Sequence, residues 1–440
     1  MAFLCLVPIQ WVKLISIGGA TLKLAHLGLL IPPLALLLRR KIVVPSSGLM
    51  GVFIIHPILL GVLLASVPLS EQPGTGLFIV VRMSAYYIFG VVTFLWLSTL
   101  SRSELSNTLS KAVFFVVPWI FLVFGYYIAI SGTNIIDVFL NAVRSGNPNY
   151  IQYHLFVMVL NKGSLEGLSE EEMIDAAGRH GIMIFLIIIF FSRILIPRQA
   201  ESRFVRVSGI ILCWLLVLFV VISLSRAAML IFMCSGVLFL TSKAVKSEIK
   251  PVTLFAFSFA ALPAFTYIII NGGGAIGYVL YEKFIVDIAN NPRVFEFLQI
   301  IDKINAKAIL GYGAGTELNL FGLPAKFPHN IALFWWHQAG ILGLLSAMLA
   351  VLSFSYLCVR LLTLSIAEKS SVLSDIYLFS SILLVPAIVR MLVAKQGALA
   401  LTEWISIALS VSVCIIYHRS RVAQDSEVPR NICFEGPLSR

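Results

Sequence analysis

The sequence predicts an all-α, polytopic transmembrane helical bundle of about 11–12 spans, each about 20 residues long. Hydrophobic residues make up 59% of the 440 residues and charged residues 12%, whereas soluble domains carry about 25% charged residues. The mean hydropathy of +0.96 leaves too little polar surface for a water-soluble chain. These observations exclude a soluble enzyme, a secreted disulfide scaffold and a disordered protein.

Apolar runs predict the individual spans. Residues 2–38 predict either one long span or a hairpin of two, and the start lacks the basic segment and cleavage site of a signal peptide. We therefore expect this segment to remain as an anchor. The later runs are 48–68, 77–99, 110–131, 180–197, 207–224, 226–242, 252–270, 330–357, 372–391 and 398–417.

Basic residues predict the orientation of the bundle. Counting spans puts all the groups of Lys and Arg at one end, and that end is expected to be cytoplasmic because cytoplasmic loops are enriched in these residues. This placement accounts for the net charge of +11 through membrane topology, so nucleic acid is not an expected partner. The groups contain Arg39–Lys41, Arg102 and Lys111, Arg193–Arg206, Lys243–Lys250, Arg360 and Lys369, and the tail from Arg419.

Two long polar segments face the opposite, outer end. Long loops on one face are where functional residues usually lie. In the second segment, apolar residues recur at helical spacing from Val294 to Ile304, which predicts an amphipathic helix. The expected regions are N-terminal transmembrane helices (1–131), an outer segment (132–179), central transmembrane helices (180–270), a large outer loop (271–329), C-terminal transmembrane helices (330–417) and a cytoplasmic tail (418–440).

Two arginines at the outer face are candidate anion-binding residues. Arg226 lies between two apolar runs, where an arginine facing lipid is costly and one facing a cavity is not. The alternative is a boundary arginine that snorkels to the interface. Arg293 follows Pro292 at the start of the predicted loop helix, and a helix N-terminus suits phosphate. Its alternative is a surface arginine on an amphipathic helix.

His329 is the candidate general base, because a histidine titrates near neutral pH. It precedes Asn330 and the predicted span 330–357 at the membrane boundary, where the alternative is an interfacial residue without a catalytic role. His337, eight residues further on within Trp335-Trp336-His337, is predicted to be a packing or aromatic-belt residue. Arg179, at the outer start of another span, is either a sugar contact or a boundary anchor.

The glycine cluster Gly311–Gly315 lacks the Lys-Ser/Thr of a phosphate-binding loop and follows no predicted strand. We expect it to allow close backbone packing. The six cysteines lie at scattered spacing, and neither a metal site nor a cofactor is expected.

The guanidinium groups of Arg226 and Arg293, together with His329 as a base, favour transfer of a group from a diphosphate leaving group to a hydroxyl. The two arginines would take the place of a divalent cation.

These motifs, in this order, resemble the O-antigen ligase and polymerase superfamily of bacterial envelope glycosyltransferases. The resemblance covers residues 205–365 and departs from the family at Gln338, where many members have an acidic residue. The matching pieces are Leu224-Ser225-Arg226-Ala227-Ala228, the segment from Arg293 to Gly315, His329-Asn330-x-x-Leu333, and Gly340-Ile341-Leu342-Gly343-Leu344-Leu345.

The resemblance implies a GT-C-like, inverting, metal-independent glycosyltransferase of the bacterial inner membrane, with its active site facing the periplasm. Arg226 and Arg293 would bind the diphosphate of an undecaprenyl-linked glycan donor, and His329 would activate the acceptor hydroxyl. Asn330 and Arg179 are further candidate substrate contacts. The acceptor is either lipid A core, as for a ligase, or a lipid-linked repeat unit, as for a polymerase, and the motifs do not separate the two.

Two other classes remain as alternatives. A transporter, such as a lipid-linked sugar flippase, would have discontinuous helices near the bilayer midplane and related halves. The sequence has no paired Gly or Pro breaks at corresponding positions. A scaffold membrane protein would not need Arg226, Arg293 and His329 in this order.

Overall fold

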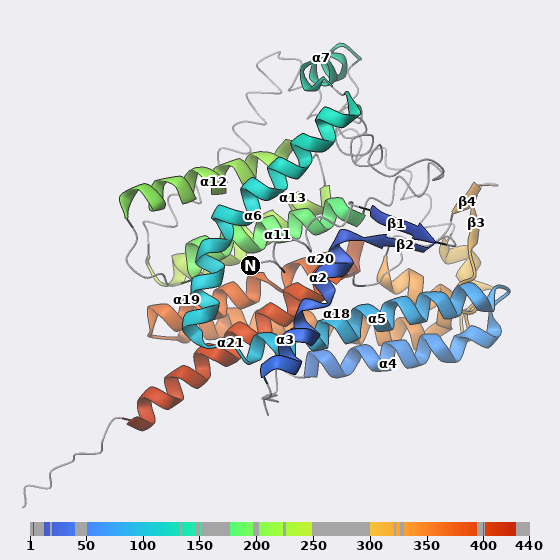
Figure 1. Cartoon of the computed structure of the whole chain (residues 1–440). Coiled ribbons are helices and arrows are strands. Elements are labelled where there is room, and N and C mark those ends of the chain that lie inside the picture. The colour runs from blue at the N-terminus through green and yellow to red at the C-terminus, as the bar shows by residue number, and fades with distance from the viewer. Residues whose placement is uncertain are drawn as a thin grey trace, which may run out of the picture.

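The computed structural model of the chain is an all-α helical bundle (Figure 1). Among the residues that the structure describes, six helical segments are long and apolar enough to cross a membrane, which confirms the predicted polytopic class. The structure describes residues 3, 13–17, 20–39, 51–132, 134–145, 150, 177–196, 202–222, 226–248, 300–320, 323–325, 330–393, 399 and 401–427.

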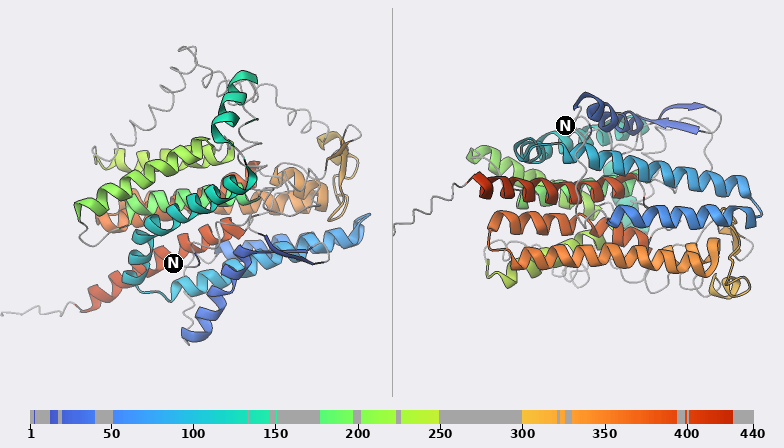
Figure 2. Two further views of the ribbon diagram at one scale, coloured as in Figure 1. Left: turned by 45° about the horizontal axis from the view of Figure 1, so that its top comes forward. Right: turned by 90° about the horizontal axis from the view of Figure 1, so that it is seen from below.

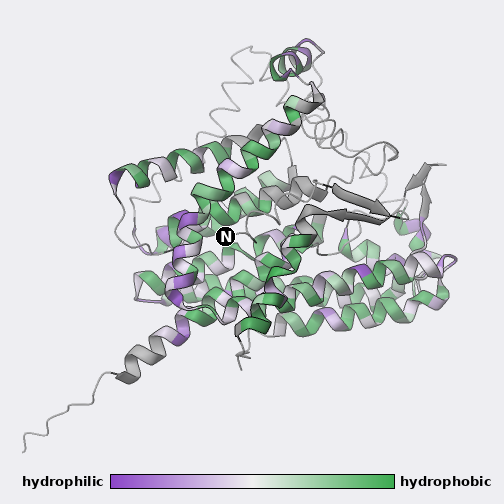
Figure 3. Ribbon diagram, in the orientation of Figure 1, coloured by the Kyte–Doolittle hydropathy of each residue, from purple (hydrophilic) through white to green (hydrophobic). Residues whose placement is uncertain are grey.

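The long helices lie side by side along a common direction (Figure 2). Apolar residues run along their lengths and hydrophilic residues gather toward their ends (Figure 3). The helices are α2 (Leu24–Leu29), α3 (Ile31–Arg39), α4 (Gly51–Ser66), α5 (Pro73–Ser98), α6 (Arg102–Ser131), α7 (Ile135–Ser145), α11 (Ala177–Leu195), α12 (Arg203–Ile222), α13 (Arg226–Val245), α18 (Ile331–Ala367), α19 (Ser371–Ile382), α20 (Val385–Val393) and α21 (Leu401–Glu427).

Nine of the ten predicted spans after residue 40 coincide with these helices, and the predicted span 252–270 lies outside the described residues. α6 begins before its apolar run because Ser101 and Glu104 form a capping box. It ends where Gly132 adopts a left-handed conformation with φ 64°. α7 is a helix of the outer segment that the sequence analysis did not predict.

The N-terminal segment differs from the predicted helical span or helical hairpin. Residues 13–23 contain an antiparallel pair of strands, β1 (Lys13–Ile17) and β2 (Ala20–Lys23), followed by α2 and α3. Two glycines stand between the strands in the sequence, and a glycine pair favours a tight hairpin turn over a helix. A second short pair, β3 (Leu318–Leu320) and β4 (Leu323–Ala325), lies in the large outer loop.

Basic groups from different loops lie close together in two pairs. Lys246 Nζ, after α13, donates to the carbonyl oxygen of Glu368, after α18, at 2.6 Å. The guanidinium of Arg102, at the start of α6, lies 4.8 Å from the ring centroid of Tyr417 near the end of α21. Each pair agrees with the span count, and the cytoplasmic orientation stays a prediction.

Candidate functional site

α18 is not one continuous helix. Ala339 (φ −131°, ψ 17°) and Gly340 (φ 63°, ψ −152°) leave the helical conformation. A continuous helix would separate Ile331 from Phe354 by about 34 Å, yet both line the same small pocket. Residues 331–338, the fold-back segment, therefore run antiparallel to the spanning helix that begins at Ile341.

This geometry corrects the predicted single span over residues 330–357. The bend requires glycine at two positions, because a Cβ atom on Gly340 would clash with the carbonyl oxygen of Ile309 and one on Gly343 with that of Trp335. The eight residues of the fold-back segment rise about 12 Å along their helix. Asn330 therefore lies about 12 Å from the bend, toward the interior of the bundle. The sequence analysis had placed Asn330 at the outer boundary.

Residues 311–315, the glycine loop, hold the end of the fold-back segment. The last carbonyl groups of a helix have no partner within it. Here Tyr312 N donates to His337 O at 2.7 Å and Gly313 N donates to Gln338 O at 3.0 Å. Gly311, Gly313 and Gly315 all have positive φ, and a Cβ atom on any of them would clash with backbone. The predicted role of this cluster in close packing is confirmed.

Gln338 and His337 complete this contact. The Gln338 amide is buried, accepts from Gly315 N, and donates through Nε2 to Thr316 O at 2.9 Å and His337 Nδ1 at 2.8 Å. The His337 ring stacks on Tyr312 with centroids 4.9 Å apart, which confirms His337 as a packing residue. The Nε2 bonds need a donor that a carboxylate lacks, which explains glutamine at this position.

Asn330 joins the start of the fold-back segment to the end of α20. Its Oδ1 accepts from Ala332 N at 2.7 Å and Leu333 N at 3.4 Å, as an N-cap does. Its Nδ2 donates to the carbonyl oxygen of Leu392 at 3.2 Å. These bonds are all to backbone, so Asn330 has a structural role, and its role as a substrate contact stays a prediction.

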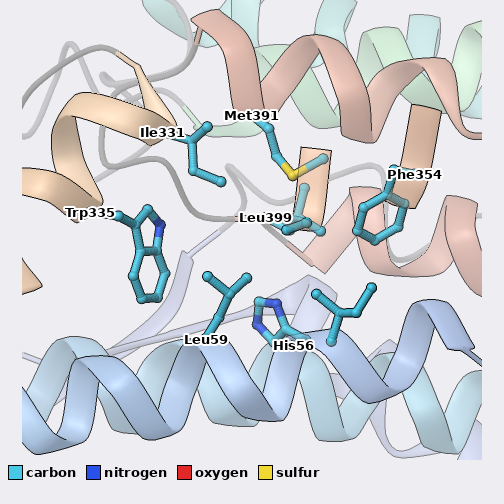
Figure 4. A pocket seen from close by; sticks show the side chains of 9 residues that line it. His56, Leu59, Ile331, Trp335, Phe354, Met391 and Leu399 are labelled. Carbon is cyan, nitrogen blue, oxygen red and sulfur yellow. The ribbon is translucent and has the colours of Figure 1, made fainter. Parts of the chain in front are cut away.

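A small, mostly apolar pocket lies beside the fold-back segment, between α4, α18, α20 and the start of α21 (Figure 4). His56 is its polar lining residue. The His56 side chain is buried, and its Nε2 has no hydrogen-bond partner among the described residues. Its ring lies edge-on to Trp404, with centroids 4.7 Å apart. The sequence analysis missed His56, although a histidine inside an apolar span is a recognisable signal.

A buried ion pair lies close to this pocket. Arg390 Nε of α20 is 3.8 Å from Glu403 Oε1 of α21, and the Glu403 side chain is 1% exposed. Glu403 Oε2 accepts from Thr402 Oγ1 at 3.2 Å. The sequence analysis overlooked both charges, which fall inside predicted spans. Ionisable residues inside membrane spans commonly mark functional sites.

α20 contacts two of the segments that carry predicted site residues. α13, which begins at Arg226, packs against α19 and α20, and Lys243 Nζ of α13 lies 2.6 Å from Asp375 Oδ1 of α19. The fold-back segment is joined to α20 by the bond from Asn330 to Leu392 O.

The structure does not describe the other predicted side chains. Arg226 is the first residue of α13 and Arg179 lies in the first turn of α11, but both side chains fall outside the described part of the structure. Arg293 and His329 also lie outside the described residues. Comparison with known proteins gives no matching family model and no matching curated protein.

Within the described ranges, no three His, Cys, Asp or Glu side chains come close enough to hold a metal ion. The described site combines the capped start of the fold-back segment, the start of α13 and a buried guanidinium–carboxylate pair. Guanidinium groups attract anions. The arrangement suits a ligand with a charged group and an apolar part.

Proposed function

We propose that the protein is a membrane glycosyltransferase that transfers a glycan from an undecaprenyl-diphosphate-linked donor to an acceptor hydroxyl at the periplasmic face of the inner membrane. Its acceptor is lipid A core or a lipid-linked repeat unit. In this proposal Arg226 and Arg293 bind the diphosphate and His329 activates the acceptor. Asn330 positions His329, its neighbour in the chain.

One observation carries the proposal. The fold-back segment, which begins at Ile331, is joined to α20 by the bond from Asn330 to Leu392 O, and α20 also packs against α13, which begins at Arg226. Two of the motif pieces that resemble the ligase and polymerase superfamily lie at the starts of α13 and the fold-back segment. Their convergence supports a shared site, because a reaction needs the leaving group and the base together.

The proposed reaction needs only groups that these residues supply. The acceptor oxygen attacks the anomeric carbon while His329 takes the hydroxyl proton, and the bond from the anomeric carbon to the diphosphate breaks. The diphosphate leaves with the electron pair and gains one negative charge, which the arginines stabilise. A single displacement inverts the configuration at the anomeric carbon. No metal ion takes part.

Transport of a lipid-linked sugar is the second candidate function. Its support is the bend within α18 and the break between α19 and α20 at residues 383–384. Transporters often place their substrate site at such discontinuous helices. The sequence analysis found no paired breaks, and these two lie close together in the chain rather than at corresponding positions of two halves.

Substitution of His329 separates the two functions. In a strain that lacks the native gene, His329→Ala is expected to abolish surface glycan while the protein still accumulates in the membrane. His418→Ala is the matched control, because His418 is an exposed histidine near the end of α21. Long chains left on the lipid carrier would indicate a ligase, and single repeat units a polymerase. Normal glycan in His329→Ala would contradict the proposed transfer and favour transport.

A further inference from the structure

Arg390 and Glu403 are ionisable residues in the apolar interior of the bundle. Glu403 precedes Trp404, which packs so closely on α5 that a Cβ atom on Gly90 would clash with it. Glu403 is fully buried, and 19% of the Arg390 side chain is exposed. A charge at this depth is costly unless it serves a partner or a ligand.

The contacts of the Arg390–Glu403 pair leave the other nitrogen atoms of the Arg390 guanidinium available to bind a ligand. Arg390 Nε and Glu403 Oε1 are 3.8 Å apart, and each is buried without a hydrogen-bond partner among the described residues. Because Nε is inaccessible, the exposed part of the Arg390 side chain lies in its other atoms. The carboxylate therefore orients one side of the guanidinium without using its hydrogen-bonding capacity.

A second buried ion pair in the same protein shows the contrast. Lys243 Nζ donates to Glu248 at 2.7 Å and to Asp375 at 2.6 Å, and its side chain is 6% exposed. These short bonds use two of the three donors of the ammonium group, as expected of a pair that joins helices. Arg390 makes no comparable bond within the described part of the chain.

The position of Arg390 connects it to the site. It lies two residues before Leu392, whose carbonyl oxygen accepts from Asn330. α20 also packs against α13, which begins at Arg226. Arg390 therefore lies on the helix that contacts both motif segments.

We propose that Arg390 binds the diphosphate group of the lipid-linked substrate and that Glu403 is a positioning residue for its guanidinium. This assignment rests on the proposed function for the identity of the anion. A guanidinium binds phosphate oxygens through paired hydrogen bonds. A further guanidinium stabilises the negative charge that the diphosphate gains as it leaves.

The test measures binding to the purified full-length protein in detergent, so it does not depend on glycan transfer. The probes are undecaprenyl diphosphate and inorganic pyrophosphate, and the variants are Arg390→Met, Arg390→Lys, Glu403→Gln and the double variant Arg390→Met/Glu403→Gln. The double variant gives the decisive comparison with the native protein, because it removes the positive charge of Arg390 without leaving Glu403 as an unpaired buried charge. Thermal melting establishes whether each variant is folded.

Arg390→Met and the double variant are expected to weaken binding of undecaprenyl diphosphate by about tenfold or more, the usual effect of losing a charged hydrogen bond. Arg390→Lys is expected to retain part of the affinity. Weakened binding of both probes means that the anion alone is recognised, and weakened binding of the lipid alone means that the lipid-linked diphosphate is recognised. Either result supports the proposal.

A double variant that binds undecaprenyl diphosphate within about twofold of the native protein would overturn the proposal, since Arg390 would then only neutralise Glu403. A double variant that does not fold would also overturn it, because the pair would serve the fold. Failure of the proposed function looks different: binding would still depend on Arg390, whereas His329→Ala would leave the surface glycan unchanged.

Discussion

The side chain of Asn330 caps the first turn of α18 and donates to the carbonyl oxygen of Leu392, the second-last residue of α20, at 3.2 Å. One amide thus joins the start of one helix to the end of another, where the last carbonyl groups have no partner within the helix. This link holds the fold-back segment inside the bundle.

Asn330→Ala is expected to lower the free energy of unfolding by about 2 kcal/mol, because it removes both the cap and the bond to Leu392. Asn330→Asp keeps the capping oxygen and loses the donor, so a smaller loss is expected. Thermal melting in detergent measures both. Equal melting temperatures for Asn330→Ala and the native protein would show that the link contributes nothing to stability.

Gly340→Ala is expected to destabilise the bend. Gly340 (φ 63°, ψ −152°) has a backbone conformation that essentially only glycine adopts and that costs other residues about 1–3 kcal/mol. A Cβ atom here would also clash with the carbonyl oxygen of Ile309. Gly125→Ala is the matched control, because Gly125 lies within α6 with open space around it. The amounts of the two variants that accumulate in the membrane are compared. Equal amounts would contradict a bend that requires glycine at position 340.

Gln338→Glu is expected to cost about 1–3 kcal/mol, because the carboxylate cannot donate to Thr316 O or His337 Nδ1 in a buried site. Gln72→Glu, at an exposed position before α5, controls for the added charge. Melting temperatures in detergent measure the difference. A native melting temperature for Gln338→Glu would show that the glycine loop does not depend on the Nε2 bonds.

His56→Leu is expected to change the free energy of unfolding by less than about 1 kcal/mol, because the imidazole Nε2 has no partner to lose. His56→Ala leaves a cavity beside Trp404 and is expected to cost about 2–4 kcal/mol. Chemical or thermal unfolding in detergent compares the two. A His56→Leu variant as unstable as His56→Ala would mean that His56 forms a stabilising polar contact.

The sequence predicted most accurately the helices that each correspond to a single apolar run. The predicted spans match α5, α12 and α13 to within a few residues, because each of these helices is one apolar run. The start of α6 was missed because its first turns lie before the apolar run. The close packing of Gly311–Gly315 was also predictable, because a glycine cluster without a phosphate-binding pattern has few other roles.

The sequence could not predict the features that depend on tertiary contacts. Residues 331–357 are apolar on both sides of Gly340, so hydropathy does not reveal a reversal that the glycine loop stabilises. Arg390 and Glu403 are thirteen residues apart and belong to different helices, and each alone resembles an isolated charge in a span. The roles of Arg226, Arg293 and His329 stay predictions from the motif order.

The most direct measurement of the central claim is transfer by purified protein. Undecaprenyl-diphosphate-linked glycan is incubated with lipid A core or a lipid-linked repeat unit, and release of undecaprenyl diphosphate is followed together with the anomeric configuration of the product. We expect the native protein to release undecaprenyl diphosphate and to form a product of inverted configuration, and we expect His329→Ala and Arg226→Ala to abolish this activity. Transfer that continues in His329→Ala, or no transfer by the native protein to either acceptor, would contradict the central claim.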